Sequence, residues 1–166
     1  MSATTIDYTN AALIYYQQGL NEQEIEERTE VTLKMANVSR ESAEVVSDQM
    51  TAVWNNFDDG SKSLEYYADV MTALGAKTAS STAEISDGLE KFAAVAETVG
   101  LSYEYATASL ATITATTRQS ADVVGTALKT LFARIQGLSL GETLEDGVNL
   151  TKYSEALAKV GISIFE

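Results

Sequence analysis

Residues 117–135 read TRQSADVVGTALKTLFARI, and this stretch decides the fold class. Its apolar residues recur at alternating steps of three and four, which places them on one face of an α-helix; they are Ala121, Val124, Leu128, Leu131 and Ile135. Ser120 precedes the run, where its hydroxyl can accept a hydrogen bond from a backbone N–H of the first turn. Gly125 interrupts the run at a cost of about 1 kcal/mol relative to alanine, so we expect it to permit close approach of another helix.

The helix before this one is equally well marked. Ser81 and Glu84 have the spacing of a capping box, in which each side chain satisfies a backbone N–H of the other residue. An apolar stripe follows, and Gly100 is placed to end the helix in a left-handed conformation. Ser102 then begins a further helix that weakens at the two threonines Thr116 and Thr117.

The same periodicity extends along most of the chain and predicts an all-α fold, a compact bundle of six to eight helices. The chain contains no proline, which favours continuous helices over a turn-rich β-sandwich. At 166 residues it is long enough for one domain with a real core. We expect helices at about 6–18, 22–38, 40–57, 62–74, 82–99, 103–117, 121–136 and 151–160, with core anchors at Trp54, Phe57, Phe92, Leu128 and Leu131.

The pattern changes after residue 137. Asp146 and Gly147 stand between short alternating segments, which predicts a small β-hairpin at about 143–150. The last five residues, 162–166, are an apolar strand-like segment that leads to no further element. We therefore expect the chain to be one helical domain and a fragment of a longer protein.

Several pieces of the sequence resemble the core region of tail tape measure proteins of tailed bacteriophages. The resemblance rests on Gly88-Leu89-Glu90-Lys91, on residues 96–104, and on the order and spacing of Thr117-Arg118-Gln119-Ser120 and Gly125-Thr126-Ala127-Leu128-Lys129-Thr130. It extends from Trp54-Asn55-Asn56-Phe57 to Gly161-Ile162 and so covers most of the chain.

The resemblance implies a structural protein of the virion tail, or of a prophage tail. Such a protein scaffolds the tail tube, sets tail length and leaves the tail to assist genome entry. Its implied partners are copies of itself, the tail tube protein, tail assembly chaperones and the tail tip or distal tail proteins. Its implied location is the lumen of the tail tube, and the host cytoplasm during assembly.

A length estimate limits what this piece can contribute to measuring. A helix advances about 1.5 Å per residue, so even one unbroken helix of this length would reach only about 250 Å. Because glycines and caps fold the chain back repeatedly, its span is far shorter. We therefore expect a self-association or docking module, with the measuring segments elsewhere in the parent chain.

Charge is unevenly distributed. The net charge is −13, which argues against binding a nucleic acid backbone. Residues 1–60 hold 11 acidic and 3 basic residues, whereas residues 118–166 hold 6 and 5. The basic residues of residues 105–141, with one neighbouring amide, form the candidate interface: Arg118, Gln119, Lys129 and Arg134. The alternative to an interface is that these residues lie on ordinary helix faces, where they are solvated or form salt bridges.

The sequence offers little for catalysis. The absence of His and Cys removes the usual general base, thiolate nucleophile and metal ligands. Carboxylate pairs such as Asp58–Asp59 stand in glycine-bounded turns, where they usually form the turn. We expect no enzyme activity, no catalytic residues, no cofactor or metal, and no membrane segment. Two alternatives remain open: a generic or secreted helical interaction protein, and a segment associated with a cell-wall hydrolase.

Overall fold

The computed structural model describes residues 5–139, and these residues form seven α-helices and no strand. The helices are α1 (Thr5–Gln17), α2 (Glu22–Ser39), α3 (Ala43–Phe57), α4 (Leu64–Lys77), α5 (Thr82–Thr98), α6 (Tyr103–Thr117) and α7 (Ala121–Ser139). The all-α prediction is confirmed for this part of the chain. Contacts divide the chain into two units, Met1–Lys129 and Thr130–Glu166, and the boundary falls within α7.

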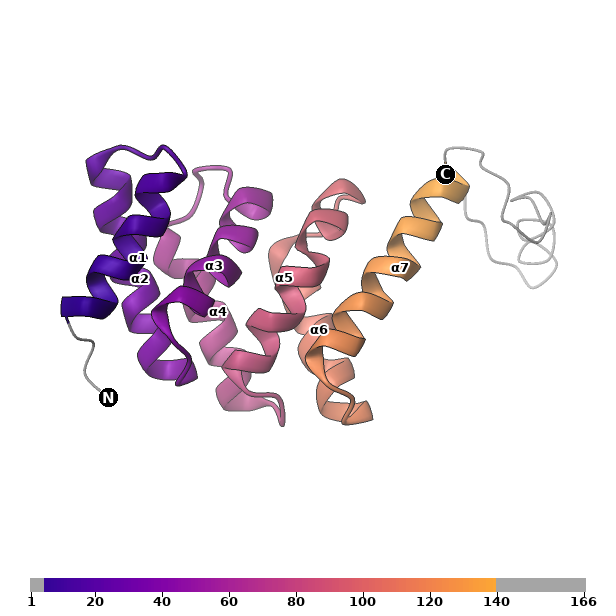
Figure 1. The fold of residues 1–166 in the computed structure, drawn as a ribbon. Helices are drawn as coiled ribbons and strands as arrows, with labels where there is room; N and C mark the ends of the chain where they lie inside the picture. Colours follow the sequence, from indigo (N-terminus) through magenta and orange to yellow (C-terminus); the bar gives the residue numbers. More distant parts are fainter. Residues whose placement is uncertain (1–4, 140–166) are drawn as a thin grey trace, which may run out of the picture. The chain divides into compact units, whose positions relative to one another are not determined.

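Helices of the first unit pack in two layers. The odd-numbered helices contact one another in order, α1 with α3 and α3 with α5, and the even-numbered helices do the same, α2 with α4 and α4 with α6. Consecutive helices contact across the layers, so the chain runs as a series of antiparallel helix pairs (Figure 1). The middle pair, α3–α4, therefore contacts the pair before it and the pair after it.

Serine N-caps mark these helix pairs at a regular spacing. The side chains of Ser42, Ser63, Ser81 and Ser102 each accept a hydrogen bond from the backbone N–H three residues on, at the starts of α3, α4, α5 and α6. At the start of α7, the Ser120 Oγ accepts from Val123 N at 3.5 Å. The caps of α3, α5 and α7 are 39 residues apart, as are those of α4 and α6. The chain thus contains a 39-residue helix-pair repeat.

Core positions follow the same period. Ala11, Met50, Leu89 and Leu128 are separated by 39 residues each, lie on α1, α3, α5 and α7, and are all buried. In the even layer Thr32, Met71 and Leu110 are likewise equivalent and buried. The repeat is therefore one of packing as well as of length, and α1 takes part in it.

A small residue recurs where successive odd-numbered helices approach. Ser47, Ser86 and Gly125 occupy equivalent buried positions on α3, α5 and α7. The hydroxyls of Ser47 and Ser86 donate to carbonyls of their own helices, so both residues present little bulk. A Cβ added to Gly125 would lie 2.5 Å from the Gly88 carbonyl oxygen of α5, so the backbones of α5 and α7 touch. This contact is the close approach that the interruption at Gly125 predicts.

Two helix ends differ from the sequence-based prediction. The helix expected at 40–57 begins at Ala43, because Arg40 adopts a left-handed conformation that ends α2 and Ser42 supplies the next cap. The helix expected to stop at Gly75 continues to Lys77. Gly75 is instead a packing residue, since an added Cβ would lie 2.5 Å from the Thr82 hydroxyl. The hairpin expected at 143–150 and the helix at 151–160 lie outside the described residues.

Candidate interaction surface

Arg118 occupies the turn between α6 and α7 and has a structural role there. Its backbone is left-handed (φ 58°), and its N–H donates to the Thr114 carbonyl oxygen at 2.9 Å. Its guanidinium donates to the Ala79 carbonyl oxygen at 3.2 Å, which ties this turn to the connection between α4 and α5. The Arg118 residue is exposed.

The other three predicted interface residues are exposed but do not form one cluster with Arg118. Gln119 lies in the same turn, where its N–H donates to the Thr117 hydroxyl. Lys129 lies about 12 Å along α7 from its first residue, and Arg134 is five residues further on. Five residues correspond to about 140° around a helix, so Lys129 and Arg134 point in different directions. Their grouping as one interface remains a prediction.

α7 also has exposed apolar side chains. Val123, Leu131 and Ile135 are exposed at 50%, 52% and 48%. Leu131 and Ile135 form an apolar stripe on one face of the helix, and Val123 lies about 80–120° around the helix from them. Leu131, expected to anchor the core, is thus half exposed among the described residues, and its role as an anchor stays a prediction. Leu131 is equivalent in the repeat to Val53 and Phe92, which are fully buried. Val53 lies on α3, which contacts the next odd-numbered helix α5, and among the described residues no helix follows α7.

The remaining core anchors differ in how deeply they are buried. Trp54, Phe92 and Leu128 are buried, and Phe57 is half-buried. The Trp54 indole N–H donates to the Leu64 carbonyl oxygen at 3.2 Å, and the Arg28 guanidinium lies 5.1 Å from the centre of the Trp54 ring. Trp54 is thus a satisfied core residue that joins α3 to the start of α4, in accordance with its structural interpretation.

An aromatic cluster in the core was not singled out by the sequence. The Tyr103 hydroxyl donates to the Tyr67 carbonyl oxygen, and the Tyr67 hydroxyl donates to the Phe57 carbonyl oxygen. Burial raises the pKa of Tyr103, and burial with the nearby Asp58 carboxylate raises that of Tyr67 to about 12. These hydroxyls stay protonated and hold backbone groups at a junction of α3, α4 and α6, so their role is structural.

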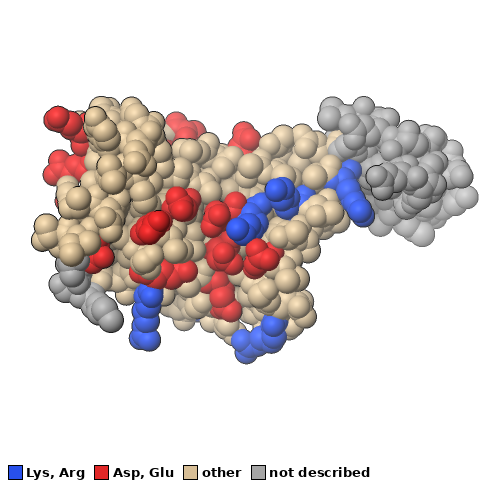
Figure 2. Space-filling model, viewed as in Figure 1, with Lys and Arg blue, Asp and Glu red and all other residues tan. Residues whose placement is uncertain are grey.

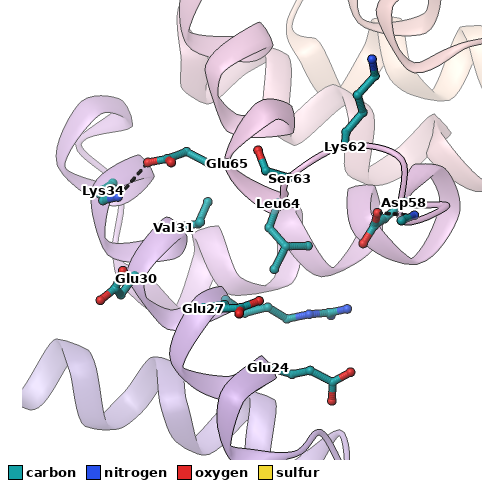
Figure 3. A pocket seen from close by; sticks show the side chains of 12 residues that line it. Glu24, Glu27, Glu30, Val31, Lys34, Asp58, Lys62, Ser63, Leu64 and Glu65 are labelled. Carbon is teal, nitrogen blue, oxygen red and sulfur yellow. Dashed lines mark hydrogen bonds and ion pairs between the residues drawn. The ribbon is translucent and has the colours of Figure 1, made fainter.

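An open groove of about 510 Å³ lies between α2 and the connection from α3 to α4. It is lined mainly by charged side chains, among them Glu24, Glu27 and Asp58 (Figure 3). The Lys34 ammonium pairs with the Glu65 carboxylate at 2.7 Å at one end. Most of these groups point into solvent, and the hydrogen bond from Lys34 to Glu65 raises the pKa of Lys34. Nothing in this arrangement places a base against a nucleophile.

Acidic groups dominate the molecular face shown in Figure 2, where basic side chains are fewer and scattered. Within the described residues, no group of three or more carboxylates is arranged to hold a metal ion. No helix among them combines the length and apolar character needed to cross a membrane. Exposed apolar side chains lie on α1, among them Ile6 and Tyr16, as well as on α7.

Comparison with known proteins places this helical chain among phage tail components. The chain matches the family described as phage-related minor tail protein over residues 1–166. It belongs to this family. No solved structure gives a significant match. As a phage minor tail protein it has a structural role in the virion tail, and tail components are its expected partners. The part played by a layered array of helix pairs in such a tail is a separate question.

Proposed function

We propose that this minor tail protein is a module of the tail tape measure, the component that scaffolds tail tube assembly and sets tail length. The proposal rests on family membership together with the resemblance of residues 54–162 to the core region of tape measure proteins. In this role it occupies the lumen of the tail tube, is present in the host cytoplasm during assembly, and leaves the tail to assist DNA entry. It binds no nucleic acid directly.

The repeat geometry supports docking rather than measuring as the task of this module. A 39-residue pair would reach about 58 Å as one straight helix. Folded back as a pair and packed against its neighbour, it advances the array by only about 8–10 Å, the usual distance between packed helix axes. Residues arranged this way are inefficient as a ruler, so we assign the ruler function to other segments of the parent protein.

The single observation that carries the docking role is the apolar stripe of α7. Leu131 and Ile135 occupy repeat positions at which α5 has the fully buried Phe92 and Ala96. A face with the composition of an inter-helix interface, left about half exposed, is typical of a surface that binds another protein. The proposed partners are other copies of the chain, the tail tube protein, tail assembly chaperones and the tail tip or distal tail proteins. Arg118, Gln119, Lys129 and Arg134 are the proposed polar residues of the interface, and they lie on more than one side of α7 and its preceding turn.

Light scattering and pull-down test this role. We expect the chain to self-associate, or to retain the tail tube or tip protein, and we expect Leu131→Glu combined with Ile135→Glu to abolish that binding. A matched control is Val38→Glu, which adds a charge at an equally exposed apolar residue of α2. A strictly monomeric chain that binds none of the tail proteins would exclude the docking role, as would equal loss of binding in the control.

A further inference from the structure

Glu41, which is half-buried, and the buried Gln49 form a contact that leaves one oxygen of each side chain without a hydrogen bond. Glu41 lies in the connection between α2 and α3, and Gln49, which is 1% exposed, lies on α3. The Gln49 amide nitrogen donates to Glu41 Oε1 at 3.5 Å, the long limit of a hydrogen bond. The other oxygen of each group, Glu41 Oε2 and Gln49 Oε1, is buried without a hydrogen-bond partner.

Both oxygen atoms lack a hydrogen-bond partner for the same reason. Both are acceptors, and a carboxylate has no proton to donate. Turning the amide over does not help, because either orientation leaves an amide oxygen without a donor. A protonated Glu41 would solve both problems at once, since its O–H can donate to the amide oxygen while the amide N–H donates back. Carboxylic acid and amide then form a two-hydrogen-bond ring.

The charges around Glu41 favour that protonated form. Asp87 and Glu90 act on it from α5, and both are acidic; Glu90 is also paired with Lys91, at 3.5 Å. Gln49 on α3 contributes no charge, and Arg40, which precedes Glu41 in the chain, is exposed. Burial, followed by the repulsion from Asp87 and Glu90, raises the pKa of Glu41 despite the hydrogen bond from Gln49.

We propose that Glu41 and Gln49 are a proton-dependent latch, which fastens the α2–α3 connection to the core when Glu41 is protonated and loosens it when Glu41 is ionised. The sign follows from linkage. A carboxyl group that binds its proton more tightly in the folded chain than in the unfolded chain contributes stability that is lost as pH rises through its folded pKa. The latch is therefore closed in mildly acidic solution and weakened at neutral and alkaline pH.

Glu41→Gln tests the latch, because glutamine has the shape of the protonated side chain at every pH. We expect the variant to raise Tm by about 2–4 °C at pH 8, and we expect this advantage to vanish below about pH 4.5, where Glu41 is itself protonated. Glu44→Gln, at an exposed site in the first turn of α3, is the matched control and should show no such gain. A difference between wild type and Glu41→Gln that does not change with pH would overturn the proposal.

A second measurement separates the latch from a general effect of removing negative charge. In a Gln49→Met background, we expect Glu41→Gln to give no gain, because its new amide has no amide oxygen to bind. An undiminished gain would assign the effect to repulsion by Asp87 and Glu90 and would refute the ring. Direct titration of the Glu41 carboxyl carbon by NMR must also give a pKa above the ordinary glutamate value of about 4.3.

Discussion

Gly88 and Gly125 bring two helix backbones into contact, and neither position has room for a side chain. An added Cβ at Gly88 would lie 2.6 Å from a methyl carbon of Leu110, whereas one at Gly125 would meet a backbone oxygen. A leucine methyl can rotate away, but a carbonyl oxygen inside a helix cannot move without moving the helix. The two glycines therefore differ in how well the structure can adapt to a substitution.

For Gly125→Ala, two effects predict opposite changes in the free energy of unfolding. Intrinsic helix propensity alone predicts that alanine stabilises α7 by about 1 kcal/mol. The contact with the Gly88 carbonyl predicts the opposite, a loss of about 1–3 kcal/mol through overpacking. We expect destabilisation in urea unfolding. A more stable variant would show that α5 and α7 do not touch at this point.

A glycine within an apolar stripe is a residue whose packing role can be predicted from the sequence. The interruption of an apolar stripe by Gly125 pointed to a helix contact, because glycine is otherwise costly there. Gly75 likewise permits a close contact, although the sequence predicts a helix end just before it, at residue 74. Only the position of Thr82, which comes from the tertiary fold, distinguishes the two roles.

At the scale of the helices, residues at equivalent positions of the repeat differ in burial and therefore in their contribution to the free energy of unfolding. Phe92 on α5 is fully buried, while Leu131, one repeat later on α7, is 52% exposed. The apolar periodicity is the same in both helices, so a stripe predicts which side of a helix is apolar. It does not predict whether a neighbouring helix covers that side.

The two positions give a paired prediction. We expect Phe92→Ala to lower the free energy of unfolding by about 3–5 kcal/mol, because it leaves a large cavity. Leu131→Ala should change it by no more than about 0.5 kcal/mol, as is usual for exposed sites. Chemical denaturation of both variants under the same conditions measures the difference. A comparable loss at Leu131 would mean that this side chain is buried in solution.

The sequence predicts where a helix starts better than it predicts whether another helix covers its apolar face. The reason is that the residues that cap a helix are close together in the sequence. The capping box at Ser81 depends on residues three positions apart, and it forms as expected. The helix start expected at residue 40 is displaced, because Arg40 turns left-handed and Ser42 caps α3 instead. The regular spacing of Ser42, Ser81 and Ser120 was present in the sequence, and a search for internal periods would have revealed the repeat.

At the scale of the whole molecule, net charge and buried tyrosines act together in alkaline solution. The chain carries a net charge of −13, so further ionisation adds to its self-repulsion. Burial raises the pKa of Tyr67 to about 12 and raises that of Tyr103 as well. In the unfolded chain, tyrosine ionises near pH 10, so there the unfolded state binds fewer protons than the folded one.

Stability should therefore fall as pH rises from about 10 to 12. Each tyrosine that remains protonated only in the folded chain contributes up to about 1.4 kcal/mol per pH unit to this loss. Urea unfolding at a series of pH values measures the slope. Tyr67→Phe removes one of the ionising groups, and its slope should be smaller than that of the wild type. Equal slopes would show that Tyr67 ionises normally in the folded chain.

Because every helix pair presents the same two kinds of face, the architecture is modular in units of 39 residues. Duplicating one pair would insert a new pair between compatible neighbours, and each existing contact would be recreated rather than broken. An insertion of another length within a helix would rotate the core residues that follow it, such as Met50, Leu89 or Leu128, to another face. A chain built in this way can therefore gain or lose a whole helix pair while the packing of the other pairs is kept.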